Sequence, residues 1–551
     1  MPESPASLPS RLPGVPDAPR SDELPLLEAL SADLAAAGYT HDGVAGLLGD
    51  EANAALHRDQ PVPARLVIAR ALAADPVPAV AVATALWLLG DDVAAGHVDA
   101  ALPRTGVVGL LALGLVEDAP ARGSVRAAVD LRPHASDADA ELWVASDLGA
   151  LHRPGVLRGD HVLGIGGASL TLAQATVRRP VERALDLGTG CGIQTFHLLA
   201  HARHVVATDL SWRALAFTRF NLLLNHEALG LDPRRLEDRV ELRQGSLLEP
   251  VAGEEFDLVV SNPPFVITPR APGGSEEERF TYRDGGLAGD ALVSGLIEAL
   301  PGVLTPGGTA QLLANWEIQD GPEGGEGDGA GGAGDWSARP RTWIRPGTEA
   351  WFIQREVQSP AEYAETWLRD AAEARDPARY AERYAQYLAD FASRGVGGIG
   401  FGMVWLRRPA DPAVAPVGAR FEAIGYPIEQ PIGPHLALEV DAADSLAGRD
   451  LAPLRFEVAE DVTEERHQRP GAEHPGVILL RQGAGLRRTT LLSSEEAGLV
   501  SACDGELTAG QIAHALAALL GEDAAELVPR LLDSVDRLVT TGFLSEIRNK
   551  G

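Results

Sequence analysis

A glycine-rich turn in the middle of the chain has the composition of a ligand-binding loop. The stretch ERALDLGTGCG joins an apolar strand pattern to a helix pattern that starts at Ile193. Glycine lets the backbone turn tightly and leaves no side chain between it and a ligand. The dinucleotide fingerprint requires a glycine at the position of Ile193, so a nicotinamide cofactor is disfavoured. The turn predicts a site for another cofactor, formed by Asp186, Gly188, Thr189, Gly190 and Gly192.

Two later strand patterns end in polar residues that suit a nucleoside. Asp209 ends the run HVVATD, and Ser246 ends the run VELRQGS. A carboxylate at the first position can accept hydrogen bonds from both ribose hydroxyls of an adenosyl ligand, and a serine at the second can accept one from an adenine amine. We therefore expect Asp209 and Ser246 to bind the cofactor; the alternative for Asp209 is a solvated strand end.

A second motif, Asn262-Pro263-Pro264-Phe265, follows the apolar run FDLVVS. If the Asn262 side-chain oxygen and the Pro263 carbonyl each accept one N–H, a planar nitrogen is held with its lone pair directed at an electrophile. The prolines stiffen the loop, and Phe265 offers a flat face for a base or an amide. We expect these four residues to be catalytic and Asn262 to contact the cofactor as well; a purely structural turn is the alternative.

Together the two motifs resemble the class I S-adenosylmethionine-dependent methyltransferases of the small-domain type, over roughly residues 160–316. TGCG, Asn221, NPPF and RDGGLAGDAL (283–292) resemble the glutamine N-methyltransferases of release factors, which usually have Tyr where this chain has Phe265. Phe265 and DHVLGIGGASLTLA are more similar to methyltransferases of rRNA and tRNA base amines. The resemblance implies S-adenosyl-L-methionine as cofactor and a segment at Asp160–Thr171 that closes over it. A glycine-rich connector is the alternative for that segment.

Strand and helix patterns alternate from Glu182 onward, which predicts an α/β fold with a Rossmann-like, doubly wound sheet. In such a sheet the ligands bind at the carboxyl ends of the strands, where both motifs lie. We expect further strand patterns at GGTAQLLANW, GIGFGMVWLRR and ARFEAIGY to complete the sheet.

The flanks of this domain are mainly helical and resemble winged-helix modules. We predict a disordered tail at 1–22, a winged-helix-like domain at 23–135, the methyltransferase domain at 136–430 with a Gly-rich linker at 321–335, and a C-terminal winged-helix-like domain at 431–551. The helices of both flanks carry few basic residues, which favours a docking role for proteins over nucleic-acid contact.

Composition narrows the class of protein. The 551 residues carry a formal net charge of −31, which disfavours bare DNA as a substrate. Only two cysteines are present, and neither a signal peptide nor a membrane-spanning apolar run stands out, so a soluble cytoplasmic protein is expected. His197 and His201 have metal-ligand spacing without the glutamate of an HEXXH motif, so no metal is predicted.

We therefore predict an S-adenosylmethionine-dependent N-methyltransferase. Its substrate is a planar nitrogen, with an exocyclic amine of an RNA base, alone or in a ribonucleoprotein, slightly favoured over a glutamine of a translation-factor protein. A small-molecule amine and a non-catalytic, cofactor-binding regulatory protein stay open. Tryptophans and arginines alternate over residues 336–351, where they either stack on a base or pack in the core. The sequence does not give the oligomeric state.

Overall fold

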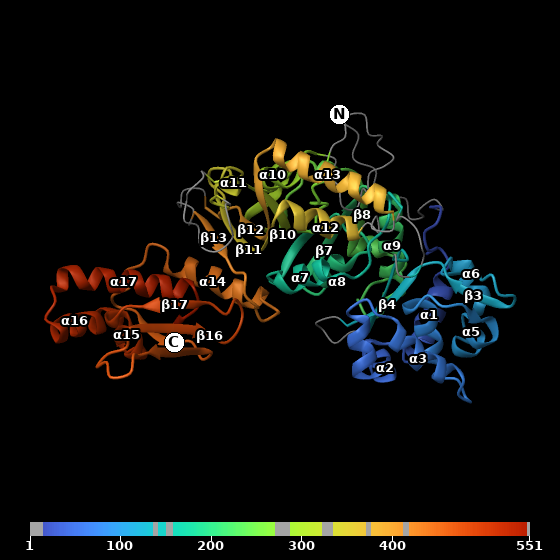
Figure 1. The fold of residues 1–551 in the computed structure, drawn as a ribbon, viewed down its shortest axis with the longest axis horizontal. Coiled ribbons are helices and arrows are strands. Elements are labelled where there is room, and N and C mark those ends of the chain that lie inside the picture. The colour runs from blue at the N-terminus through green and yellow to red at the C-terminus, as the bar shows by residue number, and fades with distance from the viewer. Residues whose placement is uncertain are drawn as a thin grey trace. The chain divides into compact units, whose positions relative to one another are not determined.

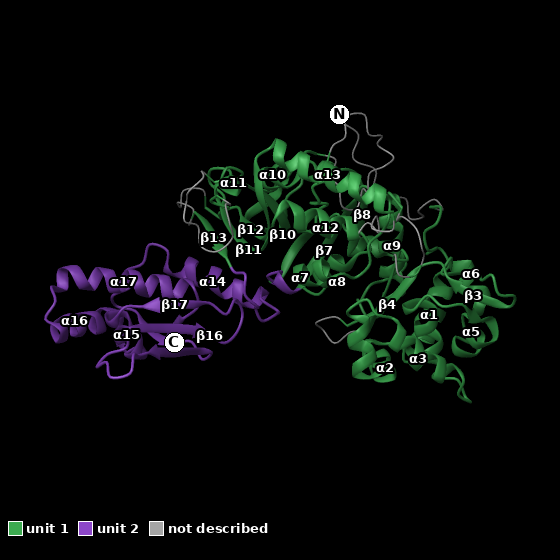
Figure 2. Cartoon of the chain, viewed as in Figure 1, with its two compact units in different colours: residues 1–173, 179–423 green, residues 174–178, 424–551 purple. Residues whose placement is uncertain are grey.

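A computed structural model of the chain (Figure 1) describes residues 15–135, 141–149, 152, 158–269, 287–321, 334–370, 376–411 and 418–547. Its contacts divide the chain into two compact units (Figure 2). The first comprises residues 1–173 and 179–423, and the second comprises residues 174–178 and 424–551. The domain boundaries given above stay predictions.

The N-terminal part of the first unit is built from short helices and small sheets. Threonine and glycine mark the ends of two of these helices. Thr40 caps α2 by accepting from the N–H of Gly43, and Gly114 ends α6 in the left-handed conformation. The helices are α1 (Leu24–Ala36), α2 (His41–Leu56), α3 (Val62–Leu72), α4 (Ala79–Ala83), the π-helix η1 (Thr84–Leu88), α5 (Ala95–Ala101) and α6 (Gly106–Leu113). Strands β1 (Val93–Ala94), β2 (Val116–Asp118) and β3 (Ser124–Ala127) pair in the order β1-β3-β2, and β4 (Asp130–Ala135) pairs with β5 (Glu141–Ser146). The alternating run VRAAVDLRPH (125–134) is thus divided between β3 and β4. The winged-helix interpretation of this region stays a prediction.

An eight-stranded mixed sheet forms the centre of the first unit, in the order β13-β11-β12-β10-β9-β6-β7-β8. The strands are β6 (Val181–Leu187), β7 (Ala202–Asp209), β8 (Val240–Gln244), β9 (Phe256–Ser261), β10 (Leu304–Gln319), β11 (Glu349–Gln358), β12 (Val396–Arg407) and β13 (Ala419–Ala423). Strands β8, β7, β6, β9 and β10 are parallel, and β12 is antiparallel to both of its neighbours. From β6 the chain adds β7 and β8 on one side of β6, and it then adds β9 and β10 on the other side of β6. The order of the strands therefore reverses between β6 and β9. The Rossmann-like, doubly wound sheet is confirmed.

Helices lie on both faces of this sheet (Figure 1). They are α7 (Gly167–Ala175), α8 (Ile193–Leu199), α9 (Trp212–Leu224), α10 (Ala291–Ala299), α11 (Ala338–Arg341), α12 (Pro360–Asp370) and α13 (Pro377–Ser393), with 3-10 turns at η2 (Leu236–Asp238), η3 (Glu249–Val251) and η5 (Leu300–Val303). Helix α10 packs in one core cluster with Val404 of β12, whereas Ile399 of the same strand lies in the cluster of α12 and α13. Because side chains alternate along a strand, these two clusters occupy opposite faces.

The second unit combines two three-stranded sheets with helices. The sheets have the orders β18-β14-β19 and β15-β16-β17. The elements are α14 (Gly433–Leu446), β14 (Arg455–Val458), β15 (Val462–His467), β16 (Val477–Gln482), β17 (Thr489–Leu492), α15 (Ser494–Ser501), β18 (Asp504–Thr508), α16 (Ala509–Leu520), α17 (Ala524–Thr540) and β19 (Leu544–Glu546). Helices α15 and α16 each begin with a capping box, formed by Ser493 with Glu496 and by Thr508 with Gln511. Its winged-helix-like character stays a prediction.

Candidate cofactor and methyl-acceptor site

The predicted site residues meet at one edge of the central sheet. In the strand register Leu187 of β6 pairs with Ser261 of β9, which pairs with Leu312 of β10, and Leu187 also pairs with Thr208 of β7. The glycine turn, Asp209 and the NPPF motif directly follow these paired residues in sequence. All three therefore lie at the carboxyl ends of adjacent parallel strands. The reversal of strand order between β6 and β9 is the position where open α/β sheets bind their ligands.

The glycine turn after β6 is open. Gly188 and Gly190 have φ angles of 79° and 59°, and a Cβ added to either would have no atom within 4 Å. These conformations favour glycine, and the space beside the turn is large enough for a ligand to approach the backbone. The geometry fits the adenosyl cofactor that the sequence predicts.

Asp186 lies beneath this turn and keeps one polar atom unused. Its Oδ2 accepts hydrogen bonds from the hydroxyls of Thr189 and Thr195, at 2.7 and 2.6 Å. Its buried Oδ1 has no hydrogen-bond partner among the described residues. Burial raises the pKa of Asp186 to about 6. An unpartnered carboxylate oxygen at this position is suited to a cationic ligand group.

Asp209 ends β7 with both oxygens turned to the backbone of neighbouring loops. Oδ2 accepts from the N–H of Gly190 at 3.0 Å, and Oδ1 accepts from the N–H of Ser211 at 2.8 Å. A carboxylate has about four acceptor positions, so two stay available for ribose hydroxyls. Asp209 thereby ties the glycine turn to the start of α9, and burial raises its pKa.

Ser246 lies farther out than the sequence predicted. Strand β8 ends at Gln244, and Ser246 belongs to the turn that follows, where its carbonyl accepts from the N–H of Glu249 at 3.0 Å. The Gly245 N–H still donates to the Asp209 carbonyl of β7 at 3.0 Å, and the paired register of the two strands ends at Gln244. A contact from Ser246 to the adenine stays a prediction.

Apolar side chains that the sequence analysis did not select surround this end of the sheet. Leu210 follows Asp209 and is 55% exposed, and Leu247 follows Ser246 and is 38% exposed. Exposed leucines directly after two predicted cofactor residues are candidates to pack against an apolar ring. The signal that could have found them is an apolar residue on a loop that directly follows a polar strand end.

The NPPF motif presents a second unused acceptor. The Oδ1 atom of Asn262 is buried and has no hydrogen-bond partner among the described residues. The loop is held from both sides, since the Ser261 hydroxyl donates to the Leu187 carbonyl at 2.8 Å and the Ile267 N–H donates to the Tyr363 hydroxyl at 2.8 Å. Pro263 is buried, whereas Pro264 and Phe265 are half-buried and Phe265 packs against the core under α10. The loop therefore holds in place an amide oxygen that no group in the described ranges binds.

The motif at 283–292 is described only from residue 287. Asp290 is buried, accepts the N–H of Glu317 at 2.9 Å and forms a two-pronged ion pair with Arg339. Arg394, the residue that follows α13, forms an ion pair with Glu317 of β10 at 2.7 Å. These bonds hold the residues before α10 at the carboxyl end of β10, next to the NPPF loop in the strand order.

The tryptophans of the 336–351 stretch pack inside the domain. Trp336 stacks on Trp316 of β10 with ring centroids 5.6 Å apart, and Trp343 and Trp351 are buried. Of the two interpretations of this stretch, the packing of core aromatics is the one that the structure supports.

The histidines serve structure in the described part of the chain. His197 is buried and meets His134 at 3.4 Å, and His201 contacts the carbonyl of Arg179 at 3.0 Å. Within the described ranges, no group of three or more His, Cys, Asp or Glu is arranged to hold a metal ion. Nor do these ranges contain a helix with the length and apolarity needed to cross a membrane.

Two protein-family models match the chain. Residues 151–272 match the methyltransferase small domain, and residues 36–128 match a domain of unknown function, DUF7059. The first match contains the glycine turn, Asp209 and the NPPF motif. The second lies in the N-terminal helical region.

Curated relatives are similar over the same central region. A release factor glutamine methyltransferase of Moorella thermoacetica is 37% identical over 133 residues, which are 23% of this chain and 44% of that protein. A ribosomal protein uL3 glutamine methyltransferase of Bradyrhizobium diazoefficiens is 31% identical over 160 residues, 28% of this chain and 46% of that protein. The chain spans about half the length of the curated relatives it matches.

Solved structures resemble the chain more distantly. A 16S rRNA N2 G1207 methyltransferase of T. thermophilus, in complex with AdoMet and guanosine, has 19% identity and a TM-score of 0.23, and the match covers 36% of this chain and 49% of that one. A methyltransferase of Pyrococcus furiosus has 14% identity and a TM-score of 0.24 over 47% of this chain and 92% of that one. The family match does not depend on these structures: residues 151–272 match the methyltransferase small domain, and the doubly wound sheet that they enter is the fold expected of a class I S-adenosylmethionine-dependent methyltransferase.

Proposed function

We propose that the chain is an S-adenosylmethionine-dependent N-methyltransferase that acts on a planar nitrogen. The observation that carries the proposal is the buried Oδ1 atom of Asn262, which has no partner among the described residues. It lies at the same sheet edge as Asp186 and Asp209. A buried acceptor without a partner costs stability, on the order of 1–3 kcal/mol, which a bound N–H group would offset.

The cofactor, when bound, supplies an electrophilic methyl group. Asp209 is placed to accept the ribose hydroxyls, and the open turn at Gly188 and Gly190 is placed to receive the amino-acid part of the cofactor above Asp186. Asn262 Oδ1 and the Pro263 carbonyl accept the two N–H groups of the substrate nitrogen. They orient its lone pair and stabilise the positive charge that develops on it, so no strong base is required.

Two substrate classes are supported by different observations. The amide of a protein glutamine is favoured by the relatives, whose names give release factors and ribosomal protein uL3 as substrates, and by the formal net charge of −31, which repels a nucleic-acid backbone. Phe265, in place of tyrosine, favours the exocyclic amine of an RNA base. The glutamine of a translation protein is therefore our first candidate substrate, and the exocyclic amine of an RNA base is our second. A cytoplasmic location fits both substrates.

The test is transfer of labelled methyl from S-adenosylmethionine into ribosomes, release factors and total RNA, each supplied separately to the purified chain. Label that protease removes identifies a protein amide, and label that ribonuclease removes identifies a base. The Asn262→Ala variant is the matched control for chain-dependent labelling. Cofactor binding without label in any fraction would overturn the enzymatic proposal and leave a cofactor-binding regulatory protein.

A further inference from the structure

Residues 158–170, which we call the bridging segment, are fastened next to both cofactor loops. At one end the carbonyl of Ser169 accepts from Gln194 Nε2 at 2.8 Å, and Gln194 follows the glycine turn on α8. At the other end the carbonyl of Asp160 accepts from Arg213 Nη1 at 3.0 Å, and Arg213 follows Asp209 on α9. The segment therefore runs from the loop that carries Asp209 to the loop that carries Gly192.

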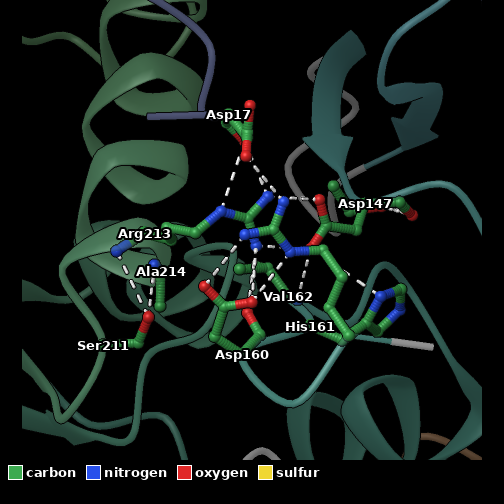
Figure 3. Close-up of polar contacts among 10 residues, drawn as sticks. Asp17, Asp147, Asp160, His161, Val162, Ser211, Arg213 and Ala214 are labelled. Atoms are coloured by element: carbon green, nitrogen blue, oxygen red, sulfur yellow. Dashed lines mark hydrogen bonds and ion pairs between the residues drawn. The ribbon is translucent and has the colours of Figure 1, made fainter. Parts of the chain in front are cut away.

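Arg213 makes most of the contacts at the Asp160 end of the bridging segment (Figure 3). It is 6% exposed, and its two terminal nitrogens bind the two oxygens of Asp147 at 2.8 and 2.7 Å. Its Nε and Nη2 atoms also donate to the carbonyl of Asp17, at 3.2 and 2.6 Å. One guanidinium thus joins three parts of the chain that are far apart in sequence.

Asp147, which binds Arg213, is also hydrogen-bonded to the bridging segment. The Asp147 N–H donates to the Val162 carbonyl at 3.1 Å, and the Val162 N–H donates to Asp147 Oδ2 at 2.8 Å. Asp147 is therefore bound to the segment by its backbone and its side chain, and Arg213 neutralises its charge. Removal of Arg213 would leave this nearly buried carboxylate without its guanidinium partner, with the His161 ring 3.7 Å away as the remaining ion-pair contact among the described residues.

The same arginine is bonded to the predicted ribose site through one residue. Ser211 Oγ accepts from the N–H of Arg213 at 3.2 Å, and the Ser211 N–H donates to Asp209 Oδ1 at 2.8 Å. A shift of Arg213 would consequently move the first turn of α9 and the carboxylate of Asp209 together.

The N-terminal region joins this network through residues 17–20. Arg158 binds Asp17 Oδ2 and Asp160 Oδ1, both at 2.9 Å, and the Arg20 N–H donates to the Leu113 carbonyl at the end of α6 at 2.8 Å. The sequence analysis predicted a disordered tail over residues 1–22. Residues 1–14 lie outside the described residues, and within the described part of that stretch Asp17 and Arg20 make these bonds.

We propose that Arg213 is a positioning residue of the cofactor site. It fixes the bridging segment and Asp209 in one arrangement, and it makes cofactor affinity depend on the N-terminal residues 17–20. This inference rests on the proposed function, because it takes the cofactor to lie between the two loops. Arginine is required in this role because its planar group donates to Asp147, Asp160 and Asp17 at once, whereas lysine has a single nitrogen.

The test compares Arg213→Lys with Arg203→Lys, a matched control on an arginine that is 79% exposed. We expect Arg213→Lys to raise the Kd for S-adenosylhomocysteine, measured by calorimetry, and the KM for S-adenosylmethionine by about tenfold or more, with kcat changed less than threefold. A merely structural role would lower the melting temperature and leave Kd and KM unchanged, and that result would overturn the proposal.

Two further measurements cover a variant that fails to fold. The double variant Arg213→Met/Asp147→Leu removes both buried charges and should fold while binding S-adenosylhomocysteine at least tenfold more weakly. In the wild-type chain, S-adenosylhomocysteine should slow deuterium uptake in residues 158–170 and 17–20, and unchanged uptake there would contradict the inference. A wild-type chain that does not bind S-adenosylhomocysteine at all would instead refute the proposed function.

Discussion

Asn221 holds the backbone of Ala145 at both of its polar groups. The Ala145 N–H donates to Asn221 Oδ1 at 2.8 Å, and Asn221 Nδ2 donates to the Ala145 carbonyl at 2.9 Å. Asn225, one helical turn later, does the same with Trp143 at 2.8 Å in both directions. Asn221 of α9 and Asn225, the C-cap of that helix, thus satisfy one edge of β5 in the way that a neighbouring strand would.

Asn221→Ala is expected to destabilise the first unit by about 2–4 kcal/mol. The substitution leaves the Ala145 N–H and carbonyl without their partner, and it also removes the bond from Asn221 Nδ2 to the Cys191 carbonyl in the glycine turn. Thermal unfolding monitored by circular dichroism measures the loss, with the exposed Gln60→Ala as control. An unchanged melting temperature would show that these bonds contribute little.

Asn262→Ala is expected to reduce kcat for methyl transfer at least about a hundredfold, with cofactor affinity changed only a few-fold. The reason is that the substitution removes an N–H acceptor to which none of the described residues donates. Steady-state kinetics and calorimetry with S-adenosylhomocysteine check the two quantities, and Asn53→Ala on α2 is the control. Equal losses in both would mean that Asn262 mainly holds the cofactor or the loop.

Cofactor affinity should fall in acid because of Asp186. Its pKa of about 6 means that the carboxylate is ionised at pH 7 and largely protonated at pH 5, where it no longer attracts the cationic cofactor. The Kd for S-adenosylmethionine should rise up to about tenfold between these pH values, measured by calorimetry. The Asp186→Asn variant should bind S-adenosylmethionine more weakly at pH 7, with a Kd that is nearly independent of pH. A wild-type Kd that stays constant between pH 7 and pH 5 would refute the role of Asp186 in attracting the cofactor.

The same pKa has a consequence for stability. The folded-state value of about 6 lies above the ordinary value of 3.8, so the folded chain binds this proton more tightly than the unfolded chain. The contribution of Asp186 to stability is therefore largest below pH 3.8 and falls as the pH rises to about 6. Relative to Asp186→Asn, the wild-type melting temperature without cofactor should decline across that window.

Asp209→Asn is expected to weaken S-adenosylhomocysteine binding by about 10- to 100-fold. Hydrogen bonds to a charged acceptor contribute about 1.5–3 kcal/mol, and an amide offers one acceptor oxygen where the N–H groups of Gly190 and Ser211 already use two. The exposed Asp232→Asn is the control, measured by the same calorimetry. Unchanged affinity would place the ribose elsewhere.

The sequence by itself determined the sheet type and which motifs lie together at one edge of the sheet. The glycine turn, Asp209 and the NPPF motif could be located because each directly follows a strand, and the carboxyl ends of parallel strands meet at one edge. Strand β11 was not recognised, since its place between β12 and β13 depends on pairing with strands that follow it in the chain.

Only the tertiary structure decided what holds that edge in place. Arg213 binds Asp147 and Asp17 across 66 and 196 residues of sequence, and Asn221 reaches Ala145 across 76. Local periodicity contains no signal for such pairs, because a polar residue on a helix looks the same whether its partner is water or a distant carbonyl. Whether an acceptor has a donor beside it likewise depends on every group packed around it, which only the folded chain brings together; for Asn262 Oδ1 the described part of the chain provides none.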